Sequence, residues 1–131
     1  IAIVGLSRSF HKDSRYVGRY LQSAGYRIVP VNPSANEILG QRAYPDLKSI
    51  PFEIDAVDVF LQPDQLSKVV DQAIELDSKP RAIWLQLGTG KHPAVAEKVD
   101  GNGIELYQNR CIKVDHQFLI RPKKSNSNYN D

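Results

Sequence analysis

Short apolar runs alternate with segments of helical periodicity along the first 120 residues. The β-prone runs cover residues 1–5, 27–31, 56–60, 82–86 and 104–107, and each is hydrophobic throughout. Strands that are apolar on both faces are typical of parallel sheets covered by helices on both sides. The pattern therefore predicts five parallel strands in the interior of an α/β protein.

Three of the segments between these runs have the spacing of amphipathic helices. Ser14 can cap a first helix that ends at Gly25. Pro63 suits the first turn of a second helix, and a third runs from near Pro93 to Gly101. The resulting order, β-α-β-β-α-β-α-β, predicts a doubly wound, Rossmann-like sheet in three α/β/α layers.

Length and charge restrict the class of protein. A chain of 131 residues suits one domain, here 1–120, followed by a polar, basic tail at 121–131 that we expect to be disordered. The chain has 17 Lys and Arg against 15 Asp and Glu. Without the tail the two signs balance, which argues against a nucleic-acid-binding face. No apolar run approaches the roughly 20 residues that cross a bilayer, so we expect no membrane partner and a soluble, cytoplasmic protein.

The loop after the first strand has the residues of an anion site. Open parallel sheets bind ligands outside the carboxyl ends of their strands, and a helix N-terminus favours negative charge. The loop offers a glycine for close approach, two hydroxyls and three cations: Gly5, Ser7, Arg8, Lys12, Ser14 and Arg15. These residues predict a phosphate cradle. The alternative is that Gly5 only makes the turn and Ser14 only caps the helix.

The common nucleotide fingerprints are absent. A dinucleotide site needs G-x-G-x-x-G and an acidic residue at the end of the second strand, but that strand ends in Val31, Asn32 and Pro33. A Walker A loop is absent as well. NAD and ATP are therefore disfavoured as ligands.

Several segments, in this order, carry a family resemblance. They are Val4-Gly5-Leu6-Ser7, the runs 14–21 and 25–33, Asp58-Val59-Phe60, the run 83–88, and Arg110-Cys111-Ile112-Lys113. The chain resembles the small stand-alone CoA-binding proteins, which are similar to the N-terminal domain of the succinyl-CoA ligase alpha subunit. The resemblance covers nearly all of residues 1–118.

The resemblance implies a Rossmann-like domain with strand order 3-2-1-4-5 that holds coenzyme A, or an acyl-CoA, at the carboxyl edge of the sheet. The matching positions in the four loops are Gly5, Leu6, Ser7, Val31, Asn32, Pro33, Phe60, Leu61, Gln86, Leu87 and Gly88. Backbone N–H groups and Ser7 would take phosphate oxygens. Asn32 and Pro33 would give a neutral rim, where a carboxylate would repel the ribose 3′-phosphate of CoA.

Two positions depart from the family pattern. Relatives usually have Arg directly after the third-strand Phe, and this chain has Leu61 there. A Tyr-Arg order after Ser14 is reversed to Arg15-Tyr16. Arg15 or Lys12 is the candidate replacement for the lost charge.

Catalytic candidates are few. Cys111 is the only thiol and has His116 five residues on, but a small buried cysteine is the more frequent reason for such a residue. Arg110 and Lys113 could lower the pKa of the thiol, which leaves a mixed disulfide with the CoA thiol as a minority hypothesis. The three histidines, His11, His92 and His116, lack metal-site spacing. In the ligases that this domain resembles, the phosphorylated histidine lies in a separate domain.

We therefore expect non-catalytic binding of CoA or a short acyl-CoA, as a carrier, sensor or regulatory module. One alternative is a Cys111-dependent acyl-CoA hydrolase or thiol-redox enzyme. The other is an interaction module that has lost its nucleotide ligand. A protein partner or a second copy of the chain is compatible with each of these.

Overall fold

A parallel five-stranded sheet forms the centre of the protein. The computed structural model describes residues 1–9 and 12–120, so the predicted tail at 121–131 lies outside the described residues. The strands follow the order β2-β1-β5-β6-β7, and every neighbouring pair is parallel. Their bounds are β1 Ala2–Val4, β2 Val29–Val31, β5 Ala56–Val59, β6 Ala82–Leu85 and β7 Glu105–Gln108. The predicted α/β class and all five predicted strands are confirmed.

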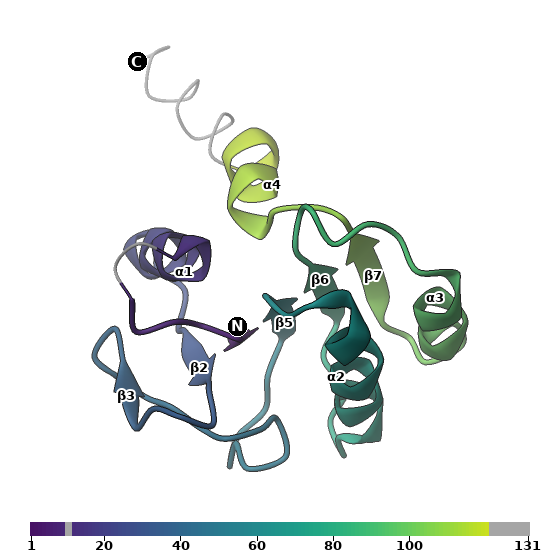
Figure 1. The fold of residues 1–131 in the computed structure, drawn as a ribbon, viewed down its shortest axis with the longest axis horizontal. Helices are drawn as coiled ribbons and strands as arrows, with labels where there is room; N and C mark the ends of the chain where they lie inside the picture. Colours follow the sequence, from purple (N-terminus) through teal and green to yellow (C-terminus); the bar gives the residue numbers. More distant parts are fainter. Residues whose placement is uncertain (10–11, 121–131) are drawn as a thin grey trace.

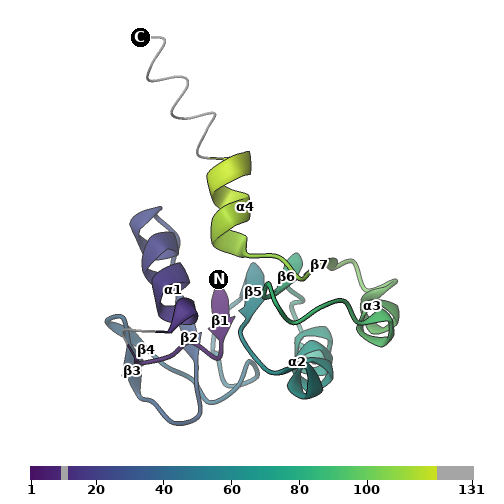
Figure 2. The same ribbon diagram turned by 45° about the horizontal axis from the view of Figure 1, so that its top comes forward.

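Helices cover both faces of this sheet. Their bounds are α1 Asp13–Ser23, α2 Pro63–Glu75, α3 Pro93–Val99 and α4 Ile112–Leu119. α1 and α4 lie on one side of the sheet, and α2 and α3 lie on the other (Figures 1 and 2). Two apolar clusters fill the layers, one containing Val17, Leu21 and Ile112, the other containing Leu66 and Val95.

The strand order differs from the predicted 3-2-1-4-5. Counted in chain order, the five predicted strands lie as 2-1-3-4-5, so the third strand pairs with the first. Crossovers between parallel strands are right-handed, and α1 covers one face on the way from β1 to β2. A right-handed return from β2 must therefore cross the opposite face. Leu47, Ile50 and Ile54 are buried in the apolar cluster on that face. The connection from β2 therefore passes over β1, and β5 pairs with the edge of β1 that β2 does not occupy.

The return connection contains a small hairpin that the sequence pattern did not predict. β3 Glu37–Ile38 and β4 Gln41–Arg42 pair antiparallel. Leu39 and Gly40 between them have φ of 54° and 73°, which are the left-handed values of a type I′ turn. Gly40 therefore makes a tight turn between two very short strands.

The helices agree with the sequence pattern at most of their ends. α1 closes at Gly25, which has φ of 98°, with the N–H of Tyr26 bonded to the carbonyl of Leu21. α2 begins at Pro63 as predicted, behind a capping box formed by Gln62 and Gln65. α4 was not predicted, because Ile112 is its only buried residue and its apolar side chains do not form one stripe. None of the helices in the described ranges is long and apolar enough to cross a membrane.

Candidate functional site

A cavity of about 530 Å³ opens at the carboxyl edge of the sheet. The loops that follow β1, β2, β5 and β6 meet there, next to the first turn of α1. The lining residues are Gly5, Ser7, Lys12, Asp13, Ser14, Asn32, Phe60, Leu61, Gln62, Gln65, Gln86 and Thr89. Parallel strands bring these distant segments together because all their carboxyl ends lie at one edge.

Gly5 holds the loops after β1 and β5 in direct contact. Its φ is 84°, and its N–H bonds to the carbonyl of Val31 at 3.0 Å. A Cβ atom at this position would lie 2.3 Å from the carbonyl oxygen of Phe60. Only glycine satisfies both the left-handed backbone and this close approach. The tight turn predicted at Gly5 is therefore present, and it forms one wall of the cavity.

Two serines organise the first loop. The N–H of Ser7 donates to Oγ of Ser14 at 3.0 Å, and the N–H of Ser9 donates to Oγ of Ser7 at 3.0 Å. Each hydroxyl keeps its own hydrogen for donation to a ligand. The predicted helix cap is wrong, because α1 begins at Asp13 with Lys12 as N-cap. Ser14 lies in the first turn, buried, where its hydroxyl holds the loop instead.

Asn32 connects the loop after β2 to the first loop. Its Nδ2 donates to the carbonyl of Leu6 at 3.0 Å, and its Oδ1 accepts from the N–H of Ser34 at 2.8 Å. Both ends of the carboxamide are thus occupied by backbone groups. Asn32 gives the cavity a rigid, neutral wall where a dinucleotide site would carry a carboxylate.

Gln86 presents an acceptor without a partner. Its N–H bonds to the carbonyl of Val59 at 3.1 Å, and its carbonyl accepts from Oγ1 of Thr89 at 2.7 Å. The side-chain Oε1 is buried and has no hydrogen-bond partner among the described residues. A buried unsatisfied acceptor is costly, so a ligand N–H or O–H at this place would be favoured.

The structure divides the predicted binding residues into two groups. Those that line the cavity are Gly5, Ser7, Lys12, Ser14, Asn32, Phe60, Leu61 and Gln86. Those outside its lining are Leu6, Arg8, Arg15, Val31, Pro33, Leu87 and Gly88. Leu6 and Val31 are buried in the core, whereas Arg8, Pro33 and Leu87 are exposed.

Four lining residues were missed by sequence reasoning. They are Asp13, Gln62, Gln65 and Thr89. Gln62 and Gln65 flank Pro63 with the spacing of a capping box, which would have placed them at a helix start beside the third strand. Thr89 stands between two glycines, a loop signal that does not by itself indicate a ligand.

Comparison with known proteins decides the family. The family model described as a CoA binding domain matches residues 1–117. The chain belongs to this CoA-binding domain family.

Two known proteins resemble the chain over most of its length. It is 38% identical over 116 residues to the uncharacterized protein YneT of Bacillus subtilis (strain 168), covering 88% of this chain and 84% of that protein. A solved hypothetical protein from Pyrococcus horikoshii OT3 has a TM-score of 0.83 and 34% identity, covering 91% of this chain and 82% of that one.

The domain also occurs within a much larger enzyme. The chain is 31% identical over 81 residues to an ADP-forming acetate–CoA ligase of Archaeoglobus fulgidus, covering 57% of this chain and 12% of that protein. The predicted family resemblance is thus confirmed for the domain, and the chain matches only a small part of that ligase.

In this CoA-binding domain, Cys111 lies outside the cavity lining. Its thiol is free and half-buried at the N-cap of α4, where it packs against the apolar cluster under α1. Nδ1 of His116 and the hydroxyl of Tyr20 share a hydrogen bond of 2.7 Å. The imidazole therefore connects α4 to α1. The structure brings neither residue to the cavity.

The other histidines form no metal site in the described ranges. His92 bonds through Nε2 to the carbonyl of Thr89 at 2.7 Å, and His11 lies outside the described residues. Among residues 1–9 and 12–120, no group of three or more His, Cys, Asp or Glu side chains is placed to hold a metal ion.

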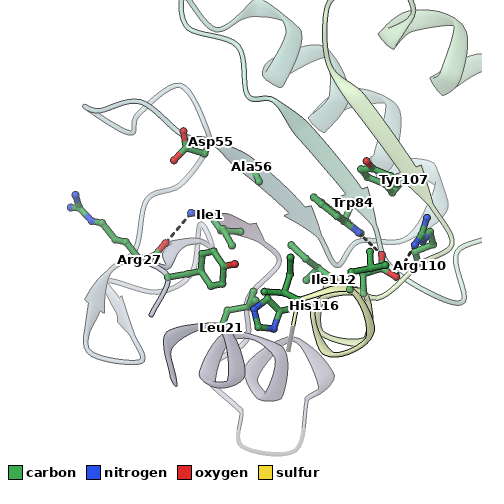
Figure 3. A pocket seen from close by; sticks show the side chains of 14 residues that line it. Ile1, Leu21, Arg27, Asp55, Ala56, Trp84, Tyr107, Arg110, Ile112 and His116 are labelled. Carbon is green, nitrogen blue, oxygen red and sulfur yellow. Dashed lines mark hydrogen bonds and ion pairs between the residues drawn. The ribbon is translucent and has the colours of Figure 1, made fainter. Parts of the chain in front are cut away.

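A second cavity, of about 510 Å³, lies between the sheet and α4, beside the end of α1 (Figure 3). The rings of Trp84 and Tyr107 stack on its floor with centroids 4.6 Å apart. Nε1 of Trp84 donates to Asp115 at 2.8 Å, and Arg110 binds the other oxygen of this carboxylate at 2.9 Å. None of the predicted CoA-binding residues lines this second cavity.

Asp58 is a buried acid on β5, two residues before Phe60. It lies between Ile3 and Trp84 on the neighbouring strands and is completely buried. Its two carboxylate oxygens have no hydrogen-bond partner in the described part of the chain. Burial disfavours the charged form and raises the pKa of Asp58 to about 8. The carboxyl group is therefore largely protonated at neutral pH.

Proposed function

We propose that this domain binds coenzyme A, or a short acyl-CoA, in the carboxyl-edge cavity and holds it without turning it over. The observation that carries the proposal is the meeting of four strand-end loops with the first turn of α1 in one cavity, in a chain of the CoA-binding domain family. The proposed role is that of a carrier, sensor or regulatory module. Its proposed setting is the cytoplasm.

The cavity has the groups that a diphosphate requires. The N-terminus of α1 supplies the positive end of the helix dipole, and Ser7 and Ser14 supply hydroxyl donors at the same place. Lys12, as N-cap, adds a cation. These groups support the placement of the ligand's phosphates over the start of α1.

The opposite wall suits a neutral, amide-containing arm. Gln62, Gln65 and Gln86 line it, and the free Oε1 of Gln86 can accept a hydrogen bond from an amide N–H. Phe60 and Leu61 add apolar surface between them. The pantetheine arm of CoA combines amide and aliphatic groups in this way.

Thermal unfolding with a panel of ligands tests the proposal. The panel is CoA, acetyl-CoA, NAD and ATP at matched concentrations. A ligand at about 100 times its Kd adds roughly 2.7 kcal/mol of stability, which raises Tm by several degrees in a domain of this size. We expect CoA and acetyl-CoA to raise Tm, and NAD and ATP to leave it unchanged. No shift with millimolar CoA would overturn the proposed function.

A matched pair of variants locates the ligand. Gln86→Glu places a negative charge in the cavity with almost no change in shape, so it should weaken CoA binding by about tenfold or more. Gln72→Glu makes the same change on α2, outside the cavity lining, and should leave binding close to that of the unmodified chain. Equal effects of the two variants would place CoA elsewhere.

Incubation with acetyl-CoA tests the non-catalytic part of the proposal. We expect the release of free thiol to stay at the rate of buffer alone. Release that depends on the protein and disappears in Cys111→Ser would instead establish a Cys111-dependent enzyme.

A further inference from the structure

The charge of the carboxyl-edge cavity is balanced. Among the described lining residues, Lys12 carries the positive charge and Asp13, next to it, carries the negative charge. The remaining polar walls are hydroxyls and carboxamides from Ser7, Ser14, Thr89 and the asparagine and glutamine side chains. The cavity can thus make many neutral hydrogen bonds but offers little net positive charge.

The nearby arginines do not add to this lining. The guanidinium of Arg15 bonds through Nη1 to the carbonyl of Arg8 at 3.5 Å, and Arg8 itself is exposed. The position after Phe60, which faces the first loop, is occupied by Leu61. Its Cδ2 atom lies 3.3 Å from where a Cβ on Gly5 would be. An apolar side chain therefore occupies the place where a cation would contact both loops.

We propose that the cavity recognises the diphosphate and the amide arm of its ligand and leaves the ribose 3′-phosphate in solvent. CoA and dephospho-CoA then bind with nearly equal affinity. This inference rests on the proposed function, because it states which groups of CoA the same cavity contacts. The ligand class is a nucleoside diphosphate joined to a neutral amide arm, with no requirement for a further phosphate.

The physical reason is the cost of bringing a phosphomonoester into this cavity. The 3′-phosphate adds about −1.5 to −2 charges, and enclosing such a group without a cation loses its hydration. Sites that read a phosphate do so with charge-assisted bonds, above all from Arg. Lys12 is already at the start of α1, where the diphosphate is placed, and Asp13 offsets its charge.

Calorimetric titration of the full chain with CoA and with dephospho-CoA tests the inference. At about 0.15 M salt we expect the two Kd values to agree within about threefold, whereas a cation that paired with the 3′-phosphate would separate them by about tenfold or more. A ratio of tenfold or more in favour of CoA would overturn the inference while leaving CoA binding intact. Binding of neither ligand would overturn the proposed function instead.

Two variants test the cause. Leu61→Arg adds a cation beside the first loop, where the diphosphate is placed, so it should strengthen the binding of CoA and of dephospho-CoA by the same factor, whereas the neutral control Leu61→Met should change neither Kd. Lys12→Ala should weaken CoA and dephospho-CoA by the same factor. A ratio of the two Kd values that either Leu61→Arg or Lys12→Ala alters would contradict the assignment.

Discussion

The backbone N–H of Ser7 donates a 3.0 Å hydrogen bond to the side-chain oxygen of Ser14, seven residues away. This bond connects the loop that follows β1 to the first turn of α1. Because Ser14 is buried in the first turn of α1 and also lines the cavity, the loop shape and the proposed ligand binding would both depend on the same hydroxyl. A phosphate bound there would contact a preformed loop.

Replacement of this hydroxyl should affect binding more than folding. Ser14→Ala removes one hydrogen bond, so we expect a loss of about 1 kcal/mol in the free energy of unfolding and a Kd for CoA about tenfold higher. Ser23→Ala, at the exposed end of the same helix, is the control and should change neither quantity. Denaturant unfolding and calorimetric titration measure the two effects. Unchanged CoA affinity in Ser14→Ala would remove the hydroxyl from the site.

Gly5 and Gly25 differ in what a methyl group would meet. Gly5→Ala forces a Cβ to 2.3 Å from the carbonyl oxygen of Phe60, in addition to the cost of positive φ. Gly25 has positive φ as well, but nothing lies within 4 Å of a Cβ there. We expect Gly25→Ala to cost about 1–2 kcal/mol and Gly5→Ala about 3 kcal/mol or more. Similar midpoints in urea for the two variants would show that the contact with Phe60 relaxes freely.

Asp58 should make stability depend on pH. The pKa of Asp58 is about 8 in the folded protein, whereas an ordinary aspartate has a pKa of 3.8, so the unfolded chain loses the proton first as the pH rises. The contribution of this carboxyl group to the free energy of unfolding is fully present below pH 4. It decreases progressively between pH 4 and pH 8, with a slope of at most about 1.4 kcal/mol per pH unit. Asp58→Asn should flatten the profile of Tm against pH over this range. Asp77→Asn, at an exposed acid, is the control. A parallel profile in Asp58→Asn would contradict this origin.

The hydroxyl of Tyr20 ties α4 to the rest of the fold through His116, at 2.7 Å. α4 has eight residues and only Ile112 buried, so it depends on such contacts more than a long helix does. Tyr20→Phe should lower the free energy of unfolding by about 1 kcal/mol. Amide hydrogen exchange should become faster in residues 112–119 than in the unmodified protein and stay nearly unchanged in the rest of the chain. The matched change at exposed Tyr16 should leave exchange in α4 unaltered. Faster exchange throughout the chain would indicate a global effect instead.

Local features of the sequence are sufficient to predict much of the fold. Continuous apolar runs indicate buried parallel strands wherever they occur, and Gly25 and Pro63 mark helix ends through backbone preferences that act within a few residues. The predicted turn at Gly5 is of the same kind, because positive φ is a property of one residue. The class of the fold and the edge that holds the cavity follow from these local rules.

Other features depend on contacts between distant segments. The strand order depends on which face of the sheet Leu47, Ile50 and Ile54 cover. The spacing of these residues in the sequence does not indicate which of the two faces that is. The hydroxyl of Ser14 bonds to the first loop instead of capping α1, because the turn brings the N–H of Ser7 within reach.

The α/β class, the five strands, three of the helices and the four loops that could hold a ligand can all be predicted from the amino-acid sequence. Which residues of those loops line the cavity depends on how distant segments pack: Gln62, Gln65 and Thr89 line it, whereas Leu87 and Gly88 do not. The same packing buries Asp58 without a hydrogen-bond partner among the described residues. The reason is that periodicity reports how a segment is patterned, while the direction of each side chain depends on which distant segment packs against it.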